Sequence, residues 1–178
     1  MKLDAHKLVS PPRPRYFDGR VLTAEDFRAE QNYHREKLWL HNRMLHGYGI
    51  VSGLDVAIEE NEGGDALAVI APGYALDGYG RELFVTEPLR VSVGHDRRDF
   101  VVYLKYAERD DPTSVIPQPD CEPQATRVIE TVQVLFEPPA ERMTPPTARE
   151  DFAISLARFR KPHHQWQHDR NFRPPRAK

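Results

Sequence analysis

Cysteine is nearly absent from this sequence. Cys121 is the only one among 178 residues, which excludes an internal disulfide framework and a multi-cysteine zinc site. Apolar residues never run to the roughly 18 positions that a membrane-spanning helix requires, and residues 1–17 lack the apolar segment of a signal peptide. We therefore expect synthesis and assembly in the cytoplasm, without direct insertion into a membrane.

A surplus of charge of either sign is also missing. The chain has 25 Lys and Arg residues against 27 Asp and Glu residues, a formal net charge of −2, which predicts no general attraction to nucleic acid. Hydrophobic residues make up 39% and charged residues 29% of the sequence, as in a polar globular protein. The length suffices for one substantial core.

Motifs for covalent catalysis and phosphate binding are absent as well. Ser52 and Ser155 lie outside a G-x-S-x-G elbow, and acidic neighbours of Cys121 disfavour a reactive thiolate. The glycines of "GYALDGYGRE" do not have the phosphate-binding spacing and occur in a β context. The sequence therefore predicts a protein without enzymatic activity and without a cofactor.

Carboxylates are plentiful, but a glycosidase needs two of them opposed across a cleft. The acids at predicted strand ends and turns, where solvated acids are common, are Asp77, Glu82, Asp96, Asp99, Asp110 and Asp111. We interpret them as solvated groups. A hydrolase that uses opposed carboxylates ranks last among the functional hypotheses.

Two groups of histidines are candidate metal ligands. His34 and His41 are seven positions apart, whereas helical metal pairs usually have a spacing of four, so a structural role is favoured. His164 and His168 have the right spacing, but Pro162 and Pro174 disfavour a helix there. A solvated or partner-binding tail is the preferred interpretation of residues 161–178, and metal binding by its histidines is the alternative.

One helix is predicted over residues 23–46. Thr23 and Asp26 give the spacing of a capping box, no Gly or Pro occurs from Ala24 to Leu45, and Gly47 is a typical C-terminal stop. At about 1.5 Å per residue this helix would span roughly 33 Å, which is long for a domain of this size.

The predicted helix carries two stripes of side chains. The first stripe consists of Phe27, His34, Leu38, His41 and Leu45. The second, about 120° away around the axis, consists of Tyr33, Leu40 and Met44. Two stripes favour contact with two surfaces, the chain's own β-domain and a neighbouring subunit. The alternative is a single broad buried face with Lys37 at its edge.

The stretch "LHNRMLHGYGIVSGLDV" is predicted to join the helix to a sheet. Gly47, Gly49 and Gly53 allow the turns that release the helix. Asn42 and Arg43, on the polar side of the helix, are expected to bond loop backbone and hold the exit angle.

Period-two alternation predicts antiparallel β-structure over residues 47–160. "NEGGD" is typical of a hairpin turn before the return strand "ALAVIA". "FVVYLKYAER" is apolar on both faces and is expected to be the central strand, paired with "RVIETVQVLFE", and "FAISLARF" gives the last strand. The predicted fold class is α+β, mainly β: a long N-terminal helix followed by an antiparallel β-sandwich or barrel-like domain.

Proline-rich arms frame this domain. Residues 1–22 are predicted to form an extended arm, because Pro11, Pro12 and Pro14 disfavour helix, and residues 161–178 a basic tail. The connections 110–125 and 137–150 also contain several prolines and are expected to be surface loops without regular structure. Arms without a core of their own become ordered along a neighbour, which favours a protein of a multi-subunit assembly.

Three motifs resemble a known family. "YFDGxxLTAEDF", "LHNRxLHGxGIVxGL" and "G-x-ALDxxGRE" are similar to phage-tail-related proteins associated with extracellular contractile injection systems, over roughly residues 13–159. The resemblance implies a structural subunit of a tail, baseplate or fibre region. Its expected partners are other structural subunits, in a homo-oligomer, ring or fibre, and the particle could be released from the cell.

The sequence thus predicts a non-enzymatic subunit with a baseplate, fibre-attachment or tail-adaptor role. Its expected partner contacts are Tyr16, Phe17, Tyr33, Leu40, Met44, Trp166 and Phe172. The alternative is a carbohydrate- or ligand-binding β-module used for surface recognition, with Tyr74 and Tyr79 as an aromatic platform.

Overall fold

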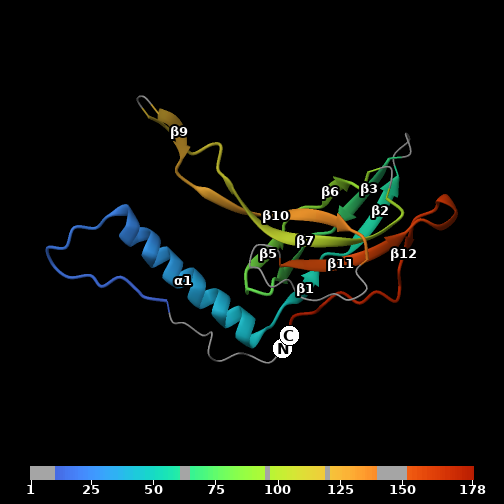
Figure 1. Cartoon of the computed structure of the whole chain (residues 1–178), viewed down its shortest axis with the longest axis horizontal. Coiled ribbons are helices and arrows are strands. Elements are labelled where there is room, and N and C mark those ends of the chain that lie inside the picture. Colours follow the sequence, from blue (N-terminus) through green and yellow to red (C-terminus); the bar gives the residue numbers. More distant parts are fainter. Residues whose placement is uncertain (1–10, 61–64, 95–96, 119–120, 140–151) are drawn as a thin grey trace.

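The structure is a computed structural model that describes residues 11–60, 65–94, 97–118, 121–139 and 152–178 (Figure 1). Helix α1 (Ala24–Leu45) has 22 residues and begins and ends where the sequence predicts. The capping box is formed, because the Thr23 backbone N–H donates to the Asp26 carboxylate over 3.0 Å and Thr23 Oγ1 accepts from the Asp26 N–H. Among the described residues no helix is both long and apolar enough to cross a membrane.

Twelve strands follow among the described residues. They are β1 (Gly49–Gly53), β2 (Val56–Glu60), β3 (Ala66–Ile70), β4 (Gly73–Leu76), β5 (Glu82–Val85), β6 (Leu89–Ser92), β7 (Asp99–Asp110), β8 (Val115–Gln118), β9 (Cys121–Ala125), β10 (Val128–Glu137), β11 (Ala153–Arg160) and β12 (Gln167–His168). They form sheets in the orders β1-β4-β5, β10-β7-β11-β12 and β2-β3-β6, and a hairpin β8-β9. Each strand pair within these sheets is antiparallel. The prediction of a mainly β chain with one helix and antiparallel sheets is confirmed.

Strand β7 is central, as predicted. It pairs with β10 along ten consecutive positions, from Val101↔Glu137 to Asp110↔Val128, and with β11 on its other edge. Its residues 100–104 are buried on both faces of the sheet, which explains why this strand lacks the apolar–polar alternation of a half-exposed strand.

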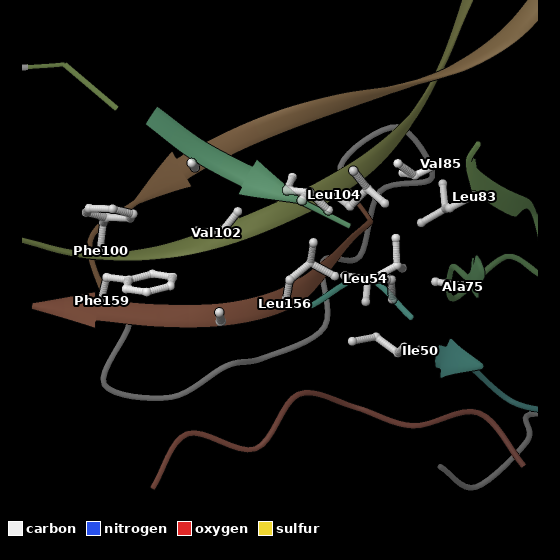
Figure 2. Close-up of a cluster of buried hydrophobic side chains, with 14 of the residues drawn as sticks. Ile50, Leu54, Ala75, Leu83, Val85, Phe100, Val102, Leu104, Leu156 and Phe159 are labelled. Atoms are coloured by element: carbon white, nitrogen blue, oxygen red, sulfur yellow. The ribbon is translucent and has the colours of Figure 1, made fainter. Parts of the chain in front are cut away.

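One hydrophobic core joins the sheets. Figure 2 shows Phe100, Val102 and Leu104 of β7 with Leu156 and Phe159 of β11, together with side chains of β1, β4 and β5. Leu54, at the exit of β1, is 1% exposed and adopts a φ of 63°. This positive φ falls between the end of β1 and the start of β2, and these two strands belong to different sheets.

The sequence predicted that the proline-rich connection 110–125 is a loop without regular structure. This prediction is wrong. Strands β8 and β9 of this connection form a hairpin, in which Val115 pairs with Ala125. Proline lacks only the donor N–H and is tolerated on edge strands, and both strands of this two-stranded sheet are edge strands. Most of the connection 137–150 lies outside the described residues.

Figure 1 shows that the C-terminal end of α1 reaches the sheets, whereas its N-terminal half extends away from them. Within α1 only Trp39 and Asn42 are buried. The described part of the N-terminal arm, residues 11–22, has no helix or strand. The remainder of the predicted arm lies outside the described residues.

Candidate functional site: the helix–sheet junction

The helix–sheet junction consists of the end of α1, the turn 77–81 between β4 and β5, and the last residues of the chain. The side-chain amide of Asn42 donates a hydrogen bond to the backbone oxygen of Gly80 over 3.0 Å. Asn42 is only 7% exposed. It therefore does not lie on the polar side of the helix, as the sequence suggested, but bonds loop backbone from a buried position.

Gly80 lets the turn approach the helix. Its φ is 87°, and a Cβ on Gly80 would lie 2.1 Å from the backbone oxygen of Trp39 and 3.0 Å from the backbone nitrogen of Arg43. Only glycine accommodates both the positive φ and this approach. Arg43, the other polar residue predicted for this junction, thus contacts the turn through its backbone.

A buried ion pair holds the same turn in shape. Asp77 is fully buried and Arg81 is 7% exposed. The Asp77 carboxylate accepts hydrogen bonds from the backbone N–H groups of Tyr79 (2.8 Å) and Arg81 (2.9 Å) and from Nε of Arg81. The prediction that Asp77 is a solvated acid is therefore wrong, because its backbone and side-chain donors replace water.

Aromatic rings enclose this ion pair. The Arg81 guanidinium lies 4.7 Å from the ring centre of Tyr106 and 5.5 Å from that of Tyr79. Burial and a 2.7 Å hydrogen bond to Glu108 raise the pKa of Tyr106, so its hydroxyl stays protonated and donates. The turn is thereby fixed to the central strand β7, and the helix is fixed to the turn.

The C-terminal residues close the junction from the other side. The Lys178 N–H donates to the backbone oxygen of His46 over 2.9 Å, and the Ile50 N–H donates to that of Pro175 over 2.8 Å. A Cβ on Gly49, whose φ is 128°, would lie 2.5 Å from the backbone of Pro175. A Cβ on Gly53, whose φ is 60°, would lie 2.1 Å from the backbone oxygen of Pro72. A Cβ on Gly47 would meet no atom within 4 Å, so only the φ of 74° favours glycine there.

The tail thus packs on the chain's own body. The indole of Trp166 lies edge-on to Phe100, 5.3 Å between ring centres, and packs against the core. Trp166 and Phe172 are partly buried. Trp166 thus contacts the core of its own chain, and its contact with a partner stays a prediction.

The two stripes of α1 have different surroundings from those that the sequence suggested. The first stripe is exposed: Phe27 by 56%, Leu38 by 47% and Leu45 by 62%. Tyr33, Leu40 and Met44 of the second stripe are partly buried. Trp39 and Asn42, which belong to neither stripe, face the body, and the spacing of apolar residues did not indicate this because Asn42 is polar.

The described arm is exposed beside the helix. Tyr16 is 52% and Phe17 is 65% exposed. The Tyr16 hydroxyl donates to the carboxylate of Glu30 over 3.2 Å, and Arg20 pairs with Asp26. These bonds position the arm on α1 and leave the ring of Phe17 open to solvent.

The predicted aromatic platform is divided between two clusters. Tyr74 lies 4.7 Å from Phe84, and its hydroxyl donates to Glu82 over 2.7 Å. Tyr79 instead packs edge-on to Phe152 and toward the core. The two tyrosines thus have different ring neighbours, and the carbohydrate-binding alternative stays a prediction.

Within the described ranges no cluster of three His, Cys, Asp or Glu side chains could hold a metal ion. His34 bonds Glu30 over 3.0 Å, and His41 lies edge-on to His46 at 5.9 Å. These contacts agree with the structural role that the sequence predicted for the helix histidines.

The comparisons with known proteins concern the fold. No protein-family model and no curated protein sequence matches this chain. The crystal structure of TssK matches with a TM-score of 0.57 and 11% sequence identity, over 93% of this chain and 42% of that chain. This chain has a TssK-like fold.

Two larger assemblies contain chains of the same fold. One is the TssK-TssF-TssG baseplate subcomplex of the type VI secretion system, seen by cryo-electron microscopy, with a TM-score of 0.55, 14% identity and coverage of 94% and 62%. The other is the baseplate complex from the type VI secretion system, with a TM-score of 0.55, 14% identity and coverage of 94% and 60%. This chain thus spans less than two thirds of each of these three chains.

Proposed function

We propose that this chain is a non-enzymatic structural subunit of a contractile, phage-tail-like particle, with a role in the baseplate or at its junction with the tail or fibres. The observation that carries the proposal is the similarity of fold over 93% of the chain to TssK and over 94% to chains of baseplate complexes. The motif resemblance to phage-tail-related proteins points in the same direction and rests on different information.

The proposed partners are other structural subunits, which assemble with this chain in the cytoplasm. The arm offers the most exposed of the predicted contacts, because Phe17 is 65% exposed while Tyr16 is tied to Glu30. Tyr33, Leu40 and Met44 are partly buried, and we propose that their accessible edges extend the same contact. Trp166 and Phe172 would contribute through the part of each ring that the chain does not cover.

The test is assembly in the source organism. We expect the tagged full-length chain to copurify with sheath, tube and baseplate proteins in sedimenting particles, and deletion of its gene to abolish these particles. Phe17→Glu should reduce incorporation, whereas Phe84→Glu, at a ring that is 58% exposed on β5, serves as the matched control. Normal particles that lack the chain would refute the proposal.

A further inference from the structure

We propose that α1 pairs in parallel with α1 of a second copy of this chain. The contact is a line of six side chains, here called the heptad seam: Phe27, Gln31, His34, Leu38, His41 and Leu45. This inference adds a self-contact to the proposed structural role. It rests on the helix alone and does not require that role.

The spacing within the heptad seam is that of a coiled coil. Successive members are separated by four, three, four, three and four positions, an average close to the roughly 3.5 residues of a heptad repeat. In this register Gln31, Leu38 and Leu45 occupy a positions, and Phe27, His34 and His41 occupy d positions. The apolar layers at Phe27, Leu38 and Leu45 are separated by polar ones, two at Gln31 and His34 and one at His41, and polar layers select register at some cost in affinity.

All six members are exposed in the single chain. The body packs on one flank of the seam, because Trp39 and Asn42 are the buried residues of α1, and at 3.6 residues per turn they lie about 120° and about 60° from Phe27 around the axis. The arm is bonded on the other flank through Tyr16 and Glu30. Neither the described arm nor the body therefore covers the heptad seam.

The flanking charges favour a second copy in parallel. Glu30 is at a g position and Arg35 at the following e position, so a parallel pair brings Glu30 of one helix beside Arg35 of the other. In an antiparallel pair e positions face e positions, where this chain has Arg28, Arg35 and the buried Asn42, and no acid. Arg35 now pairs with Glu108 at 3.6 Å, with both side chains well exposed, a contact weak enough to be shared.

The helix is also held in shape before it pairs. In proteins most of the stability of a helix comes from tertiary contacts. Here the capping box fixes the start of α1 and the bond from Asn42 to Gly80 anchors its end. Pairing thus orders little additional backbone, which lowers the entropic cost of association.

Disulfide trapping in the purified full-length chain tests the pairing and its direction. In a Cys121→Ser background, Leu38→Cys and Leu45→Cys should each give a covalent dimer on mild oxidation, because a parallel seam places identical positions opposite each other. Ala29→Cys, exposed on another side of α1, is the matched control and should stay monomeric. A dimer that forms only when Phe27→Cys and Leu45→Cys chains are mixed would overturn the parallel arrangement.

Sedimentation equilibrium of the chain without introduced cysteines tests whether the seam drives association. We expect Leu38→Glu to weaken self-association at least about tenfold, which corresponds to roughly 1.4 kcal/mol, and Ala29→Glu to leave it unchanged. Far-UV circular dichroism and thermal unfolding verify that both variants fold. Exchange of charge, Glu30→Arg with Arg35→Glu, should restore the association that either change alone weakens.

A monomeric chain at all accessible concentrations, or association that Leu38→Glu does not affect, would overturn the proposal. Association only with a helix of another protein would do the same. These measurements use the chain alone, so their failure leaves its proposed role in a particle intact. Conversely, exclusion of a self-associating chain from particles would refute only that role.

Discussion

The side-chain amide of Asn42 donates to the backbone oxygen of Gly80 over 3.0 Å and joins two residues 38 positions apart. It ties the last turns of α1 to the turn 77–81, which the Asp77–Arg81 ion pair and Tyr106 in turn tie to the central strand. The projection of α1 from the sheets therefore depends on a few polar contacts of the helix–sheet junction.

Removal of the Asn42 amide should destabilise the chain. Asn42→Ala leaves the carbonyl of Gly80 buried without this donor, and we expect a loss of about 1–3 kcal/mol in the free energy of unfolding. Urea denaturation followed by circular dichroism measures it. Asn32→Ala, at an exposed position of the same helix, should change stability little, and equal stabilities of the two variants would contradict this role for Asn42.

Substitution of Gly80 should distinguish the free-energy cost of a positive φ from the cost of a clash between the new Cβ and helix α1. Gly80→Ala and Gly94→Ala both place a Cβ at a positive φ, of 87° and 82°, and this strain costs about 1 kcal/mol. Only at Gly80 does the Cβ also meet the Trp39 oxygen, whereas Gly94 has open space. We expect Gly80→Ala to be clearly less stable in thermal unfolding, with increased proteolysis at the end of α1. If Gly80→Ala lowers the thermal stability no more than Gly94→Ala does, the turn can move away from the Trp39 oxygen at little cost in free energy.

Loss of the buried charge at Asp77 should have the largest effect. Asp77→Asn keeps the size of the side chain but leaves the charge of Arg81 without its carboxylate, and such a broken buried pair costs about 3 kcal/mol or more. Asp55→Asn, at an exposed position between β1 and β2, is the control. Chemical denaturation measures both variants, and a small effect at Asp77 would mean that the rings around Arg81 compensate for the loss.

Acid should remove a modest stabilisation at Asp99. Hydrogen bonds from Arg158, at 2.8 and 3.0 Å, lower the pKa of Asp99 below its ordinary value of 3.8. A carboxyl with a lowered folded-state pKa stabilises the fold above that ordinary value and loses this contribution as the pH falls through the folded-state pKa. Because Asp99 is 42% exposed, the contribution is well under about 1 kcal/mol.

Thermal unfolding of Asp99→Asn and the parent chain across a pH series measures this contribution. The difference in Tm should be present at neutral pH and shrink in acid. A difference that persists unchanged below the ordinary pKa of an aspartate would assign the effect to packing instead of charge.

The bounds of α1 and the pairing of β7 with β10 could be predicted because their signals are local. The cap at Thr23, the stop at Gly47 and the apolar run of β7 each act over a few residues. The β8-β9 hairpin was missed because proline removes one donor without preventing an edge pairing. The burial of Asp77 could not be predicted, because its hydrogen-bond donors are backbone N–H groups of its own turn and the side chain of Arg81. Composition does not reveal this geometry.

The sequence by itself determined helix α1, the antiparallel strands and the heptad spacing along α1. Which side of that helix faces the body was decided only by tertiary structure. The Asn42 amide is buried because Gly80, far away in the chain, presents its carbonyl there, and the heptad seam is exposed as a consequence. Local propensity sets where elements begin and end, whereas partners for buried polar groups come from residues that only folding brings together.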